Sequence, residues 1–148
     1  MGIAAKDFFS KQDQDDIRQA IMNAELDTSG EIRVHIENNC AGDVLDRAAF
    51  VFRQLNMHKT ALRNAVLIYL AVKNRKFAII GDSGINKVVP ASYWDDIKSD
   101  MLNQFREGHF SEGLIQAITS TGTHLKTHFP HQQDDVNELS DELSFGKD

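Results

Sequence analysis

Two apolar runs separated by a short polar tip dominate the hydrophobic pattern of the chain. Residues 65–72 are apolar throughout, residues 73–76 are polar, and residues 77–81 are apolar again up to a glycine. A continuous apolar run rich in aliphatic side chains is typical of a strand covered on both faces. The polar tip between two such runs predicts an antiparallel hairpin. We therefore expect this hairpin to form the core of a sheet.

A third strand is predicted at residues 31–37, where apolar and polar residues alternate strictly. Ile32, Val34 and Ile36 would face one side of the sheet, and the polar residues would face the other side. Unlike the run at 65–72, this pattern predicts a strand with one face in water or a position near a sheet edge. We interpret His35, on the polar side, as a structural residue.

Helical spacing of apolar residues predicts four helices. The first covers about residues 10–26, the second begins after Asp43, the third follows Pro90 and the fourth begins at Ser111. The order strand, helix, strand makes the strands 31–37 and 65–72 parallel to each other. The predicted fold is an α/β class, three-layer α/β/α sandwich, in which a βαβ unit is followed by the antiparallel hairpin.

The composition fits one domain with an acidic end. The chain has 148 residues, of which 41% are hydrophobic, and a formal charge of −6. Residues 134–148 hold six acidic residues and one lysine, a net charge of −5, so the rest of the chain carries −1. We predict a domain at 1–131 and a flexible tail at 132–148 that adds little stability, although Val136, Leu139 and Leu143 would allow a short docked helix. A nearly neutral body argues against a nucleic-acid partner.

The expected location is the cytoplasm. No apolar run approaches the length of a membrane helix, and the first residues lack the apolar segment of a signal peptide. We therefore expect no membrane partner. Cys40 is the single cysteine and cannot form an internal disulfide, which suits a reducing compartment.

The predicted topology brings three polar segments to one rim of the sheet. The strand at 77–81 runs antiparallel to its neighbour, so its end lies beside the starts of the other two strands. Residues 28–31, 63–64 and 81–84 then lie together. We expect the functional site of the chain at this rim.

Asp82 and Glu31 are candidate ligands for Ca²⁺ or Mg²⁺ at the rim, with Asp95 as a third ligand, because these ions prefer carboxylate oxygens. The alternative is that Asp82 caps a turn and Glu31 is solvated. Arg63 and Asn64 are candidate phosphate-binding residues, since a guanidinium binds phosphate through two hydrogen bonds. The more common alternative is that Arg63 is a surface cation paired with a neighbouring acid.

Four stretches of the chain resemble the TPM domain family, named after thylakoid lumen, photosystem II repair and nematode receptor-modulator proteins. They are residues 28–32, 63–67, 76–85 and 105–114. The resemblance spans roughly residues 10–128. It implies an α/β/α sandwich with a divalent-metal site at the rim. Acid phosphatase activity is attributed to plant members, and other members look like assembly or repair modules.

Two function hypotheses follow. The first is a cytoplasmic module that binds Ca²⁺ or Mg²⁺ and docks a protein partner, because the rim has acids but no convincing nucleophile or general base. The alternative is a metal-assisted acid phosphatase, in which Asp82 and Glu31 would hold the ion and Arg63 the phosphate. The chain departs from the usual family pattern at Ala65 and at the turn 81–84, which favours the first hypothesis. The sequence identifies no catalytic residue.

Overall fold

The computed structural model describes residues 4–90, 92–131 and 139–146. The elements in chain order are η1 (Ala5–Asp7), α1 (Lys11–Glu25), β1 (Glu31–Glu37), α2 (Val44–Gln54), η2 (Met57–Lys59), β2 (Ala65–Ala71), β3 (Lys76–Gly81), α3 (Ser83–Asn86), α4 (Tyr93–Arg106), α5 (Phe110–His128) and β4 (Ser144–Phe145).

The sheet is mixed and has the strand order β3-β2-β1-β4. β1 runs parallel to β2 with Glu31 opposite Ala65, and β2 runs antiparallel to β3 with Val66 opposite Gly81. These pairings confirm the predicted βαβ unit and the hairpin that follows it. Since β2 has a strand on both sides, its backbone is paired along both edges.

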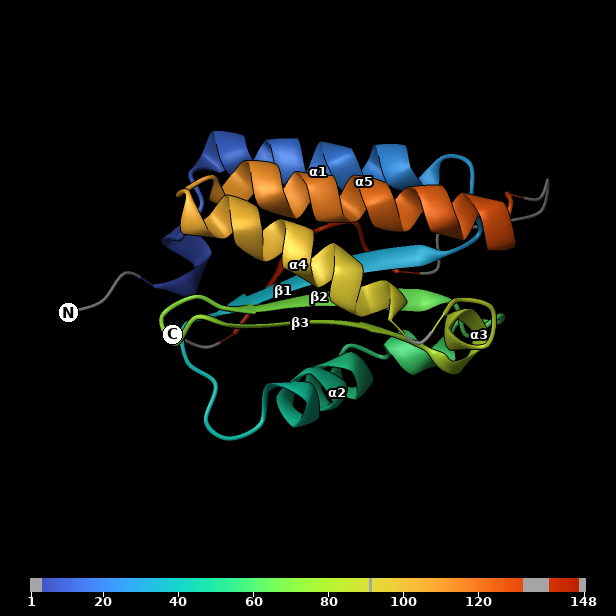
Figure 1. Ribbon diagram of the computed structural model, residues 1–148, viewed down its shortest axis with the longest axis horizontal. Helices are drawn as coiled ribbons and strands as arrows, with labels where there is room; N and C mark the ends of the chain where they lie inside the picture. Colours follow the sequence, from blue (N-terminus) through green and yellow to red (C-terminus); the bar gives the residue numbers. More distant parts are fainter. Residues whose placement is uncertain (1–3, 91, 132–138, 147–148) are drawn as a thin grey trace.

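Helices cover both faces of the sheet, which confirms the predicted sandwich. Figure 1 shows α1, α4 and α5 on one face and α2 on the other. Val66, Ile68 and Leu70 of β2 point into the core beneath α1, α4 and α5, whereas Leu67, Tyr69 and Ala71 point into a second core against α2. All six side chains are at most 1% exposed. The uninterrupted apolar run was therefore a correct signal for a strand between two layers.

Of the two alternatives predicted for β1, a position near the sheet edge is correct, since its outer neighbour β4 has two residues, and a face in water is wrong. Glu31, His35 and Glu37 are 2%, 5% and 4% exposed, and Arg33 between them is half-buried. Two features that alternation alone cannot reveal cover His35 and Glu37: β4 pairs along the outer edge of β1, and α2 contributes a charged partner to this face. Buried polar groups require such partners, because an unpaired charge is costly away from water.

Local capping interactions explain where the helices begin and end. The Ser10 hydroxyl accepts a hydrogen bond from the Asp13 amide at 3.0 Å, and α1 begins at the next residue after Ser10. Asp43 accepts from two amides at the start of α2. Gly108 has a φ of 82°, a left-handed conformation that favours glycine and ends α4. The last helix begins at Phe110, one residue before the predicted start.

The described part of the predicted tail contains a short strand that the sequence did not indicate. Ser144 and Phe145 form β4, which pairs in parallel with His35 and Ile36 of β1. The predicted docked helix is not formed by residues 139–146, and residues 132–138 lie outside the described residues. Within the described part of the chain, no helix is long and apolar enough to cross a membrane.

Candidate functional site

The predicted rim forms around an ion pair between Arg63 and Asp82. Nε and Nη2 of Arg63 donate hydrogen bonds to the two carboxylate oxygens of Asp82 at 2.7 and 2.8 Å. One oxygen of Asp82 also accepts from the amide of Ser83, so Asp82 is the N-cap of α3. Asp82 is 7% exposed. Asp82 therefore caps a turn, and Arg63 pairs with a neighbouring acid. These are the alternatives to ligand binding that the sequence left open.

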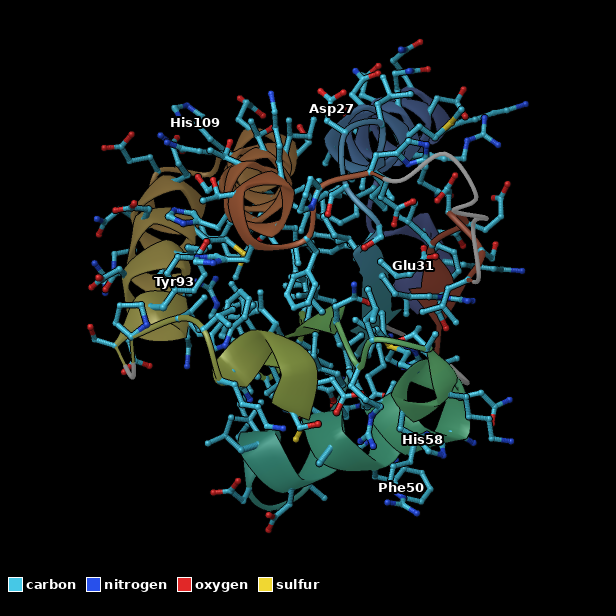
Figure 2. The ribbon with its side chains drawn as sticks, turned by 90° about the vertical axis from the view of Figure 1, so that its right-hand side faces the viewer. Asp27, Glu31, Phe50, His58, Tyr93 and His109 are labelled. Carbon is cyan, nitrogen blue, oxygen red and sulfur yellow. The ribbon has the colours of Figure 1, made fainter. Side chains whose placement is uncertain are left out.

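The side-chain hydrogen bonds between Arg63 and Asp82 do not involve the other predicted site residues. The side-chain nitrogen of Asn64 donates to the Ser29 hydroxyl at 3.3 Å, and the Glu31 amide donates to the Asn64 carbonyl. Asp95 lies exposed in the first turn of α4. Figure 2 views this end of the molecule and shows Glu31 at the side of the sheet away from α3.

The three predicted metal ligands do not fit a Ca²⁺ or Mg²⁺ ion as they stand. Both oxygens of Asp82 are bonded to Arg63, and β2 separates the strand of Glu31 from Asp82. Among residues 4–90, 92–131 and 139–146, no group of three or more His, Cys, Asp and Glu side chains is arranged to hold a metal ion.

Glu31 instead belongs to a group of carboxylates at the end of α1. Burial raises the pKa of Glu25 to about 10, assisted by a hydrogen bond with Asp141 and by the charge of Glu31. One oxygen of Glu25 accepts from the amide of Ile32 at 2.7 Å. Glu25 is therefore protonated at neutral pH, so the proton removes the repulsion that a cation would otherwise relieve.

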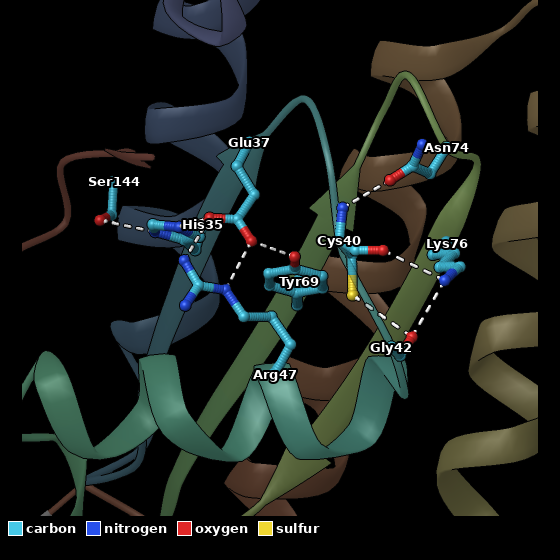
Figure 3. Close-up of polar contacts among 9 residues, drawn as sticks. All are labelled: His35, Glu37, Cys40, Gly42, Arg47, Tyr69, Asn74, Lys76 and Ser144. Atoms are coloured by element: carbon cyan, nitrogen blue, oxygen red, sulfur yellow. Dashed lines mark hydrogen bonds and ion pairs between the residues drawn. The ribbon is translucent and has the colours of Figure 1, made fainter. Parts of the chain in front are cut away.

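A second polar group lies at the opposite end of the sheet, around Glu37 at the end of β1 (Figure 3). Arg47 of α2 donates two hydrogen bonds to the Glu37 carboxylate at 2.8 and 2.9 Å. The Tyr69 hydroxyl donates to the same carboxylate, and Nε2 of His35 lies 3.2 Å from it. These four interactions connect β1, β2 and α2. Each oxygen of Glu37 takes part in two of them, so the carboxylate is fully engaged.

The protonation states follow from these contacts. Burial raises the pKa of Glu37, but hydrogen bonds from Arg47, Tyr69 and His35 outweigh it and lower the pKa to about 2. Burial lowers the pKa of His35, so its ring is neutral at neutral pH. Because an ionised carboxylate only accepts hydrogen bonds, Nε2 of His35 carries the ring proton. Nδ1 then accepts from the Ser144 hydroxyl of β4 at 3.0 Å.

The loop before α2 is held in place by the β2–β3 hairpin. Nζ of Lys76 donates to the carbonyls of Cys40 and Gly42 at 3.1 and 2.9 Å (Figure 3). The Asn74 side chain accepts from the amide of Cys40. This anchors the start of α2 and thereby places Arg47 opposite Glu37.

A groove of about 640 Å³ lies between α2 and β4, beside the Glu37 group. Arg47, Phe50 and Gln54 line it from the helix, and Ser144, Phe145 and Gly146 line it from the other side. Phe50 is 55% exposed, and the Arg47 guanidinium lies 5.2 Å from the centre of its ring. The groove reaches the carboxyl end of the parallel strands, where open α/β sheets commonly bind ligands.

Comparison with known proteins identifies the domain. The family model of the TPM domain matches residues 3–124. The chain belongs to the TPM domain family. No curated protein matches this TPM chain.

Solved structures support the same fold for this TPM domain. The NMR structure of the BA42 protein from the psychrophilic bacterium Bizionia argentinensis matches with a TM-score of 0.89 and 43% identity, over 95% of this chain and 97% of that one. An N-terminal domain from P. gingivalis has a TM-score of 0.67 and 17% identity, over 86% of this chain and 84% of that one. The N-terminal domain of cg2496 from Corynebacterium glutamicum gives 0.63 and 15%, over 80% and 74%. The last two show the fold alone.

Sequence reasoning missed the Glu37 group and the groove beside it. Tyr69 was the available signal, because it is the single residue with a polar side chain in the apolar run 65–72. A buried tyrosine hydroxyl usually has a hydrogen-bond partner. That partner should lie on the neighbouring parallel strand, where His35 is directly opposite Tyr69 and Glu37 is two residues further. Arg47 could not be placed in the same way, since its position depends on how α2 packs.

Proposed function

We propose that this TPM domain protein is a binding and assembly module that uses the groove between α2 and β4 to contact a protein partner. The observation that carries the proposal is the state of the ionisable groups. The Glu37 carboxylate accepts hydrogen bonds from three side chains, and Asp82 accepts from Arg63 and Ser83. Groups bonded in this way hold the fold together and are poorly placed to act as a general base.

The composition of the groove supports a role in contact with another chain. It presents an aromatic ring and a guanidinium side by side, and Tyr, Trp, Phe and Arg side chains are enriched in protein interfaces. Arg47 keeps 36% of its side chain exposed although it is paired with Glu37. We also propose that the module works in the cytoplasm, where a reducing environment suits the buried free thiol of Cys40.

The alternative of a metal-assisted phosphatase has less support. Its proposed phosphate ligand, Arg63, already makes two hydrogen bonds to Asp82, which was its proposed metal ligand. Steady-state hydrolysis of 4-nitrophenyl phosphate with Mg²⁺ or Ca²⁺ distinguishes the two functions. We expect equal background rates for the wild type, Asp82→Ala and Arg63→Ala. A rate that is present in the wild type and lost in both variants would establish the enzyme and overturn the proposed function.

Binding of Ca²⁺ or Mg²⁺ remains a separate prediction with its own test. Any ligand that binds the folded state alone raises the melting temperature with its concentration. Melting curves in millimolar Ca²⁺ and Mg²⁺ should be compared for the wild type, Asp82→Asn and Glu31→Gln. An increase lost in Asp82→Asn would restore the predicted site, and an increase lost in Glu31→Gln alone would place the ion beside Glu25. An unchanged melting temperature in the wild type would show that the folded protein binds neither ion at millimolar concentration.

A further inference from the structure

The described C-terminal residues 139–146 follow the outer edge of β1 from one end of the sheet to the other. Asp141 is hydrogen-bonded to Glu25 near the start of β1, and Glu142 accepts from Arg18 of α1 at 3.0 Å. Further along, Ser144 pairs with His35, and the amide of Gly146 donates to the carbonyl of Ile36 at 2.8 Å. The segment therefore runs parallel to β1 and adds a short strand to its edge.

The residues Leu143–Gly146 make distinct contacts with the domain. Leu143 and Phe145 pack against the core under α1, α4 and α5. The Ser144 hydroxyl donates to Nδ1 of His35, which faces the Glu37 group. A Cβ atom at Gly146 would lie 2.6 Å from both Cβ and Oε1 of Glu37, so this position accepts glycine alone without a shift. The edge of β1 is thus contacted by an aliphatic residue, a hydroxyl, an aromatic ring and a glycine in that order.

The attachment of the segment is nevertheless limited. Only two of its residues pair with β1, and all of residues 139–146 remain at least partly exposed. The Arg18–Glu142 ion pair is also exposed, and such pairs contribute little to stability. In addition, the TPM family model ends at residue 124, before this segment begins.

We propose that the edge of β1 is a strand-addition docking site for an extended peptide and that Leu143–Gly146 is its resident, displaceable ligand. The partner is an extended segment with the pattern aliphatic, Ser or Thr, aromatic, Gly, preceded by a carboxylate that reaches Arg18. Strand addition supplies affinity through main-chain hydrogen bonds and specificity through alternate side chains. The inference rests on the proposed binding function and specifies how the partner binds: it takes the place of Ser144, Phe145 and Gly146, which form one wall of the groove, and then faces α2 itself.

The resident segment sets how tightly a partner must bind. A ligand tethered to its site competes at an effective concentration in the millimolar range for short flexible linkers. A free peptide of the same sequence therefore binds the intact chain weakly, and a variant that releases the resident segment exposes the site. In the intact chain, Leu143–Gly146 therefore occupies the edge of β1 and competes with a partner peptide of the same pattern.

The test uses the full chain and a fluorescent peptide of residues 139–148. Gly146→Val should release the resident segment, because any side chain at this position overlaps Glu37. Faster hydrogen exchange at the amide of residue 146, which is bonded to Ile36 in the wild type, reports that release. Fluorescence anisotropy should then show saturable one-to-one binding of the peptide to the variant, at least tenfold tighter than to the wild type.

Matched peptides and a second variant make the outcome decisive. Peptides carrying Gly146→Val or Phe145→Ala should lose at least tenfold in affinity, and amide shifts caused by the parent peptide should centre on His35 and Ile36. If Gly146→Val does not fold, Phe145→Ala in the full chain serves as the released form. A folded, released variant that fails to bind the parent peptide overturns the proposal, as does equal binding of the parent and Gly146→Val peptides. Neither result affects the phosphatase assay, which tests the proposed function separately.

Discussion

Asp82 holds Arg63 in a backbone conformation that arginine rarely adopts. Arg63 has a φ of 52°, in the left-handed region, and its guanidinium donates two hydrogen bonds to the Asp82 carboxylate. The carbonyl of Arg63 also accepts from the amide of Gly84 at 2.8 Å. The turn before β2 and the start of α3 are therefore fixed by the same few contacts.

Replacing Asp82 by alanine should destabilise the fold. The variant loses the N-cap of α3, which typically costs about 0.5–2 kcal/mol, and it leaves Arg63 without its acceptor. Asp82→Asn keeps a capping oxygen and should fall between the wild type and Asp82→Ala. Urea unfolding measures the three free energies. Equal stability of the wild type and Asp82→Ala would show that the contact is not important for the fold.

Gly84→Ala should be more harmful than its half-buried position in a short helix suggests. A Cβ at Gly84 would overlap the carbonyl oxygen of Leu62 and lie 2.6 Å from that of Arg63. Both are backbone atoms and cannot move aside, so we expect a loss of about 1–3 kcal/mol. Ser83→Ala, one residue earlier and exposed, is the control and should change stability by less than about 0.5 kcal/mol. Thermal unfolding that ranks the two variants equally would contradict the clash.

Glu25→Gln should stabilise the protein at neutral and alkaline pH. The pKa of Glu25 is raised from 4.5 to about 10, chiefly by burial. Between these values the unfolded chain releases the proton and the folded chain keeps it, so the free energy of unfolding falls as the pH rises. Glutamine keeps a donor and an acceptor at this position but does not titrate.

Melting temperatures of the wild type and Glu25→Gln across the pH range test this expectation. The variant should exceed the wild type most at high pH, and the difference should shrink as the pH approaches 4.5. A constant difference would mean that Glu25 does not carry the proton in the folded state. Glu142→Gln changes an exposed acid of the same region and serves as the control.

Glu37 should have the opposite pH dependence. Although burial opposes ionisation, its hydrogen bonds lower the pKa from 4.5 to about 2. The folded state then binds the proton less readily than the unfolded state, so the stabilisation is complete above pH 4.5 and is lost as the pH falls toward 2. Glu37→Gln should cost roughly 2 kcal/mol or more at neutral pH, because a buried charged hydrogen-bond acceptor is removed from Arg47.

Urea unfolding at neutral and acidic pH measures this effect. The gap between the wild type and Glu37→Gln should narrow at acidic pH. Tyr69→Phe removes one donor and leaves the charge, so its cost should be smaller, about 1 kcal/mol. If Tyr69→Phe were as damaging as Glu37→Gln at neutral pH, the packing of the ring rather than the carboxylate would dominate.

Much of the fold could be predicted because its signals are local. The apolar run 65–72 and the polar tip after it required no knowledge of distant residues. The alternation at 31–37 gave the correct strand but the wrong environment, since the partners that bury His35 and Glu37 come from α2 and β4. Such partners depend on tertiary packing, and periodicity does not encode them. β4 was missed because two residues are too short for any periodic signal.

The candidate site was harder to predict for the same reason. The topology correctly brought Arg63, Asn64 and Asp82 to one end of the sheet, because strand directions alone determine that placement. Whether two neighbouring charged side chains bind a ligand or each other depends on differences of about an ångström in their positions. Arg63 and Asp82 bind each other. The carboxylate group around Glu25 could not be assembled from the sequence, since one of its members, Asp141, belongs to the tail that was expected to be flexible.

β4 also covers part of the outer edge of β1. Without it, the backbone groups of β1 at His35 and Ile36 would have no strand beside them on that edge. An open strand edge can pair with other chains and initiate aggregation. Any change that detaches Ser144, Phe145 and Gly146 from β1 would thus expose a strand edge to other copies of the protein and lower its solubility.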